Sequence, residues 1–192
     1  MKKTIGVFLL LLLATFKPTQ ASIIQIGPRV GLSTSHIILD SDLRKHYNPE
    51  IGLGYQLGGI ARINLPIIYI QPELLFSDSS AKYHSQNQTH TLNYKKIDAP
   101  IMVGIKFLGL IRFQLGPIFS FLLAAKDDNT DIAANYSKLT TGYQAGLGID
   151  IYKFLIDLKF ESSFSKFGDK LDEMPAEHIE SLLILSVGIN LL

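Results

Sequence analysis

The feature that most constrains this chain is a strict alternation of two kinds of side chain along nearly every extended segment. Between residues 139 and 151, one set of alternate residues is bulky and apolar, as at Tyr143 and Leu147. The other set is small or polar, as at Gly148 and Asp150. Side chains of a strand point to opposite faces with a period of two, so each segment has one apolar face and one polar face. The alternation therefore predicts an all-β fold.

Eight segments carry this pattern, at residues 25–38, 50–63, 68–77, 92–107, 111–124, 139–151, 154–164 and 178–191. Each has at least the roughly 9–11 residues that a tilted strand needs to cross a membrane. The connections are tight at residues 64–67, 108–110 and 152–153, and they are long and polar at residues 39–49, 78–91, 126–138 and 165–177. Short turns at one rim and long loops at the other are typical of outer-membrane barrels. We therefore predict an eight-stranded antiparallel up-and-down transmembrane β-barrel of OmpA or OmpX size.

The charged side chains indicate which face of the strands meets lipid. The polar face carries six basic and six acidic residues, whereas Lys95 is the exception on the apolar face. A Lys or Arg at the bilayer midplane costs about 2–4 kcal/mol, so the uncharged face is expected to meet lipid. An eight-stranded barrel is only wide enough for side chains to fill, so the charges are expected to pair inside it. The candidates for lumen ion pairs are Arg29, Arg62, Glu73, Asp98, Lys106, Arg112, Asp157, Lys159 and Glu161, with Lys96, Asp150 and Glu180 on the same face.

Glu73 has two interpretations. An ionisable group within a membrane-spanning segment is a functional candidate by default. The alternative is a structural ion pair with Arg62, Lys106 or Arg112 on neighbouring strands, because structural networks also gather charges in this way. We favour the structural pair.

The first residues have the pattern of a secretory signal peptide. Lys2 and Lys3 precede an apolar run over residues 5–13, and Ala21 ends a short stretch that suits a cleavage site. The apolar run is shorter than the about 20 residues of a membrane-spanning helix. We predict a signal peptide at residues 1–21 and an outer membrane β-barrel domain at residues 22–192, located in the cell outer membrane.

Composition and motifs argue against several kinds of function. The chain has no cysteine, which excludes disulfides and cysteine-ligated metal sites, and its net charge of +1 gives no support for nucleic-acid binding. The five histidines match no metal-ligand spacing, and no G-x-S-x-G motif is present. Ser181 lies close to His178 and Glu180 in sequence, but the alternation places it on the opposite face. We therefore expect no enzymatic activity, no metal and no cofactor.

Five local patterns resemble the PorT-like outer-membrane β-barrel family of Bacteroidota. They are Arg29-Val-Gly-Leu-Ser33, Gln71-Pro-Glu-Leu-Leu-Phe-Ser77, Tyr94-x-x-Ile97-x-x-Pro100, Gly116-Pro117 and Thr141-Gly-Tyr-Gln-Ala-Gly-Leu-Gly148. The resemblance extends over essentially the whole mature chain and implies an eight-stranded outer-membrane barrel. One branch of that family is linked to secretion of proteases across the outer membrane.

Several functions are compatible with these features. The sequence favours a non-enzymatic barrel with an ion-paired, closed lumen and a structural or surface-interaction role. The alternatives are an accessory barrel for protein secretion, a narrow porin-like channel and a soluble lipocalin-like carrier, which would carry its apolar face inside. Expected partners are outer membrane lipid and lipopolysaccharide, with secretion or envelope proteins as further partners. We expect a monomer that binds no nucleic acid.

Overall fold

The computed structural model describes residues 23–38, 48–50, 52–85, 88–127, 130–131, 137–164 and 179–192. The predicted signal peptide and its cleavage site lie outside the described residues. None of the described segments forms a helix that is long and apolar enough to cross a membrane.

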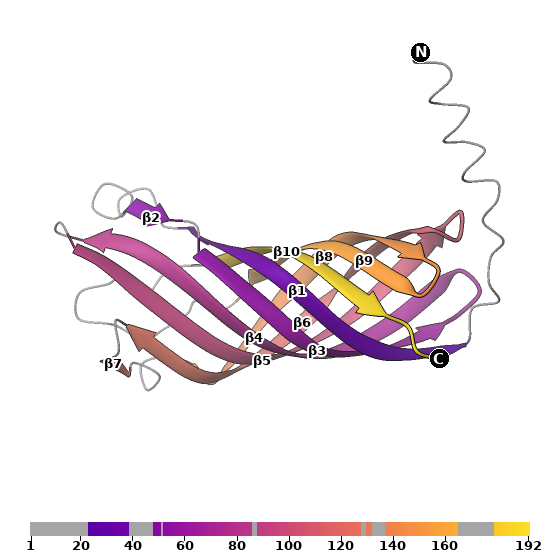
Figure 1. The fold of residues 1–192 in the computed structure, drawn as a ribbon, viewed down its shortest axis with the longest axis horizontal. Coiled ribbons are helices and arrows are strands. Elements are labelled where there is room, and N and C mark those ends of the chain that lie inside the picture. Colours follow the sequence, from indigo (N-terminus) through magenta and orange to yellow (C-terminus); the bar gives the residue numbers. More distant parts are fainter. Residues whose placement is uncertain are drawn as a thin grey trace, which may run out of the picture.

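Eight long strands form one closed antiparallel barrel (Figure 1). They are β1 (Ile24–Ile38), β3 (Gly52–Asn64), β4 (Ile68–Ser85), β5 (Gln88–Phe107), β6 (Ile111–Asp127), β8 (Leu139–Ile151), β9 (Phe154–Ser163) and β10 (Ile179–Ile189). Each strand pairs with the next along the chain, and the pairing of β1 with β10 closes the barrel. Two short strands, β2 (Asn48–Glu50) and β7 (Thr130–Asp131), pair with β4 and β6. Closure gives every long strand a pairing partner on both sides, which a sheet within lipid requires.

The two ends of the barrel differ in their connections. Three tight turns lie at one end, after β3, β5 and β8, and the two ends of the described chain lie there too (Figure 1). Leu108 and Gly109 have φ angles of 52° and 69°, and the Leu110 amide donates to the Phe107 carbonyl at 3.2 Å. Positive φ at both central residues is the geometry of a type I′ turn, whose twist matches that of the flanking strands. We call this the turn end and the opposite one the loop end.

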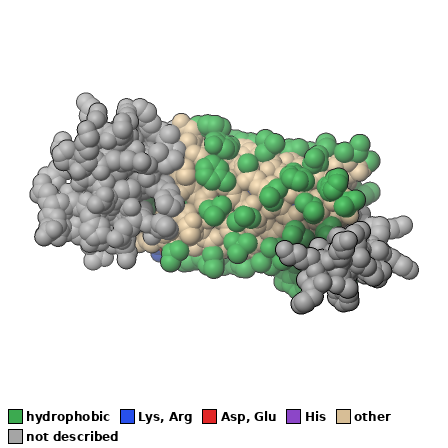
Figure 2. All heavy atoms as spheres, turned by 90° about the horizontal axis from the view of Figure 1, so that it is seen from above, with side chains coloured by type: hydrophobic (Ala, Val, Ile, Leu, Met, Phe, Trp, Pro, Cys, Tyr) green, Lys and Arg blue, Asp and Glu red, His purple; other side chains and the backbone are tan. Residues whose placement is uncertain are grey.

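The outer surface of the barrel is apolar, and green side chains are spread over the face of the barrel seen in Figure 2. Leu32, Leu115 and Leu185 are among the exposed large hydrophobic residues, whereas alternate residues of the same strands are buried. The soluble lipocalin-like alternative is therefore wrong, because such a carrier would enclose this face and expose its charges.

A row of polar side chains lies on the outer surface toward the loop end. Tyr55, Asp78 and Lys95 occupy paired positions on β3, β4 and β5. The Tyr55 hydroxyl donates to Asp78 Oδ2 at 3.3 Å, and Lys95 Nζ lies 3.7 Å from the same oxygen. Lys95, the one charged residue that the sequence places on the apolar face, therefore lies away from the middle of the apolar belt.

The predicted loop at residues 78–91 is largely strand, which corrects the sequence prediction. β4 continues to Ser85 and β5 begins at Gln88, and the ladder between them is continuous from Ser77 to Ser85 on β4. Beyond the hydrocarbon neither face of a strand needs to be apolar, so backbone pairing can continue after the alternation ends.

Candidate functional site in the barrel interior

Buried ion pairs cross the middle of the lumen. Lys159 Nζ on β9 donates to Glu73 Oε1 and Oε2 on β4 at 2.7 and 2.9 Å. Arg29 on β1 places Nη1 3.3 Å from Glu73 Oε1, and its Nη2 pairs with Asp157 on β9. All four side chains are almost fully buried. They tie three strands together across the interior.

The partners of Glu73 differ from those expected from the sequence. Its partners in the ion pairs of the described residues are Lys159 and Arg29, and not Arg62, Lys106 or Arg112. The expected partners lie on β3, β5 and β6, whereas β9 pairs with β8 and β10 and reaches Glu73 across the lumen.

A second group of charges gathers around Asp150 at the turn end. Asp150 Oδ1 accepts from Arg112 Nε at 2.6 Å, and Oδ2 accepts from Arg62 Nη1 at 3.1 Å. Lys106 Nζ lies 3.7 Å from Oδ2. Arg112 also places Nη1 2.9 Å from Asp157 Oδ1, which joins this group to the ion pairs in the middle of the lumen.

Tyr69 lies within the Asp150 group. Its ring centroid is 4.7 Å from Arg62 Cζ and 5.8 Å from Arg112 Cζ. Lys106 Nζ is 5.9 Å from the same centroid. Cations at these distances are attracted to the face of an aromatic ring, so Tyr69 partly compensates charges that share one carboxylate.

Three buried glutamines bridge charged or hydroxyl groups, and sequence reasoning missed all of them. Each accepts a hydrogen bond with its side-chain oxygen and donates one to a carboxylate with its nitrogen. Gln71 connects Arg62 to Glu73, Gln114 connects Tyr69 to Asp157, and Gln144 connects Lys159 to Glu161. Their position on the charged face is the signal that could have identified them.

The remaining predicted residues lie toward the loop end of the interior. Asp98 is buried and accepts from the Ser77 hydroxyl through Oδ2. Lys96 and Glu161 are also buried. The nine predicted lumen residues thus all lie inside the barrel, with Lys106 only half-buried at the turn end.

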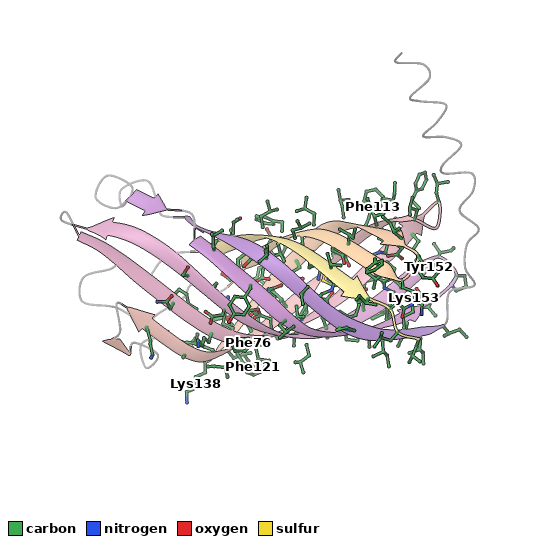
Figure 3. The ribbon with its side chains drawn as sticks, in the orientation of Figure 1. Phe76, Phe113, Phe121, Lys138, Tyr152 and Lys153 are labelled. Carbon is green, nitrogen blue, oxygen red and sulfur yellow. The ribbon has the colours of Figure 1, made fainter. Side chains whose placement is uncertain are left out.

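Side chains fill the interior. A cavity lined by Lys96, Ser120, Thr140 and Glu161 has a volume of about 10 Å³, which is room for about one water. A hollow of about 650 Å³ lies on the outer surface instead, between Phe113 and Ala145 and their neighbours. Figure 3 shows Phe113 pointing away from the barrel.

The interior packs so tightly that one glycine cannot gain a methyl group without displacing an ion pair. A Cβ atom at Gly148 would lie 2.6 Å from Arg112 Nη2 and 2.7 Å from its Cζ. We expect Gly148→Ala to destabilise the barrel by about 1–3 kcal/mol, the usual cost of overpacking. Urea unfolding in lipid vesicles measures this change.

Gly59 provides the matched control for that substitution. Its Cβ would meet no heavy atom closer than 3.8 Å, so Gly59→Ala is expected to change stability by less than about 0.5 kcal/mol. Equal stability of the two variants would contradict the close packing of Gly148 against Arg112.

The described residues offer no arrangement that supports catalysis by Ser181. Its Oγ lies 3.4 Å from Ser162 Oγ, and it shares the strand face of Leu183. His178 and the Glu180 side chain lie outside the described part of the structure. Within the described part, no group of three or more His, Asp or Glu residues could hold a metal ion.

Comparisons with known proteins agree with this architecture. A family model described as "Outer membrane protein beta-barrel domain" matches residues 17–168. No curated protein matches the sequence. The crystal structure of Ail, the attachment invasion locus protein of Yersinia pestis, in complex with the heparin analogue sucrose octasulfate is similar, with 15% identity and a TM-score of 0.51. The match covers 88% of this chain and 99% of the Ail chain.

The crystal structure of Neisserial surface protein A is a second similar barrel. It has 11% sequence identity and a TM-score of 0.52, and it covers 89% of this chain and 99% of that chain. At such low identity the likeness to both structures concerns the fold.

Proposed function

Because this chain belongs to the outer membrane protein beta-barrel domain family, we propose that it is a non-enzymatic, closed barrel with a structural or surface-interaction role. The observation that carries the proposal is the network of buried ion pairs that spans the lumen from Asp150 to Glu73 and Lys159. Charged groups paired inside a narrow barrel hold opposite walls together and occupy the space that a solute would need. With the lumen closed, the long loops of the barrel are the parts that partners can contact.

The proposal includes the route and orientation of the chain. Residues 1–21 direct export and are removed, and the mature barrel inserts with its turn end in the periplasm and its loop end outside, as is usual for barrels with short periplasmic turns. The motifs around Gln71–Ser77 and Thr141–Gly148 support a finer placement in the PorT-like family of Bacteroidota.

The expected partners follow from the outer surface. Lipid covers the apolar belt, and the Tyr55, Asp78 and Lys95 row near the loop end suits contact with the headgroup region of lipopolysaccharide. We propose a monomer, with envelope proteins binding at the loops.

The closed lumen predicts the absence of ion conduction. Purified protein in planar bilayers should give no stepwise conductance, because buried side chains fill the interior. The triple variant Arg29→Ala, Glu73→Ala and Lys159→Ala removes two cations and one carboxylate from the middle of the lumen, and it should introduce steps. Regular steps from the unaltered protein would instead support the narrow porin-like channel.

The accessory role in protein secretion makes a different prediction. If this protein is a secretion component, deleting its gene should trap exported cargo in the periplasm. If it has a structural or surface role, the deletion should leave secretion unchanged. Immunoblotting of periplasmic and external fractions distinguishes the two outcomes, and trapped cargo would contradict our proposal.

A further inference from the structure

The charges of the interior ion-pair network do not balance. Among the described residues, the ion pairs that connect Glu73, Asp157 and Asp150 join five cations to these three carboxylates, which is an excess of two positive charges within this group. The buried Lys96, Asp98 and Glu161 lie toward the loop end and are not counted in it. The cations are Arg29, Arg62, Lys106, Arg112 and Lys159, and the carboxylates are Glu73, Asp150 and Asp157. A buried charge without a counter-charge is costly, so the network favours an additional anion.

The positive excess is concentrated at the turn end. Asp150 is the carboxylate within reach of three cations there, and both of its oxygens are already engaged. The other carboxylate that Arg112 contacts, Asp157, also pairs with Arg29.

Two guanidinium nitrogens provide independent evidence for a missing acceptor. Nη2 of Arg62 and Nη2 of Arg112 have no hydrogen-bond partner among the described residues, although both side chains are fully buried. A buried charged donor without an acceptor loses its hydration without replacement.

The cluster is accessible from the turn end. The Lys106 side chain is 23% exposed and the Asp150 side chain is 15% exposed. Lys106 Nζ also donates to Asn64 Oδ1 at 2.8 Å, which holds the ammonium group at the mouth of the lumen. An anion at this mouth would contact Lys106 directly, and the two guanidinium groups lie fully buried behind it.

We propose that the turn end of the lumen binds a phosphate group through Arg62, Lys106 and Arg112. A phosphate carries a charge of about −1.5 to −2 near pH 7, which matches the local excess. Its several oxygens suit the forked donors of arginine and the point charge of lysine. The phosphate can belong to a soluble molecule or to the headgroup of a phospholipid at the rim.

Calorimetric titration of the purified barrel with inorganic phosphate at constant ionic strength tests the site. Lys106→Met should weaken binding at least tenfold, because it removes the accessible cation. Asp150→Asn should tighten binding, because it removes the carboxylate that competes for the same donors. Lys153→Met is the matched control, since Lys153 is exposed in the tight turn between β8 and β9 at the same end (Figure 3); it should bind like the unaltered protein.

A parallel titration with short-chain phosphatidylglycerol separates the two sources of phosphate. If the unaltered protein binds inorganic phosphate and Lys106→Met does not, the ligand is a soluble phosphate. If the unaltered protein binds only the lipid, and Lys106→Met loses that binding, the ligand is a lipid headgroup. Equal binding by the unaltered protein and Lys106→Met would overturn the proposal. So would the absence of binding of either probe to both the unaltered protein and Asp150→Asn.

Discussion

Glu73→Gln is expected to destabilise the folded barrel by about 3–5 kcal/mol, the usual cost of removing one partner of a buried ion pair. The substitution keeps the shape of the side chain and removes its charge. Lys159 and Arg29, which lie 2.7 and 3.3 Å from Glu73 Oε1, would then lose that counter-charge. Urea unfolding in lipid vesicles, followed by far-ultraviolet circular dichroism, measures the free energy of unfolding.

Asp78→Asn provides a control on the same strand. Asp78 lies on the outer surface, where its partner Lys95 is 54% exposed at 3.7 Å, and such surface pairs contribute about 0–1 kcal/mol. The double variant Glu73→Gln with Lys159→Met should recover part of the lost stability, because it removes one uncompensated cation. If Glu73→Gln costs no more than Asp78→Asn, the buried pairs are not what stabilises this barrel.

The strands and their faces could be predicted because lipid imposes the alternation directly on the sequence. A residue such as Arg29 or Leu115 is assigned to a face by its position in the alternation alone. The burial of Arg29 and the exposure of Leu115 agree with that assignment. The hairpin of β4 and β5 beyond Ser77 could not be predicted in this way. Its strands extend past the apolar belt, where the backbone ladder continues to Ser85 without the alternation.

The ion-pair partners could not be predicted because parity places a residue on a face without giving its neighbours across the lumen. Glu73 and Lys159 are 86 residues apart and belong to strands that do not pair. Register irregularities add to the difficulty, since a shift between Lys95 and Lys96 changes the pairing of β5 with β6. Barrel closure, tilt and register together determine which charges meet.

A substitution at a single outward residue can test whether the apolar outer face contacts lipid. Leu115 on β6 is 69% exposed and is paired with Val103 on β5 and Ala145 on β8, which lie on the same outer face. We expect Leu115→Arg to destabilise the barrel in lipid vesicles by about 2–4 kcal/mol, because the guanidinium group would lie within the hydrocarbon.

Leu53 is the matched control, because it has the same residue type and the same exposed fraction of 69%. It lies on β3 two residues beyond Tyr55 toward the loop end, where Tyr55 contacts Asp78. Leu53→Arg is therefore expected to cost about 0–1 kcal/mol, the value for a charge near the membrane interface. Equal free energies of unfolding for the two arginine variants would mean that the middle of this surface is no less hydrated than its rim. In that case lipid could not be the solvent that selected the apolar face.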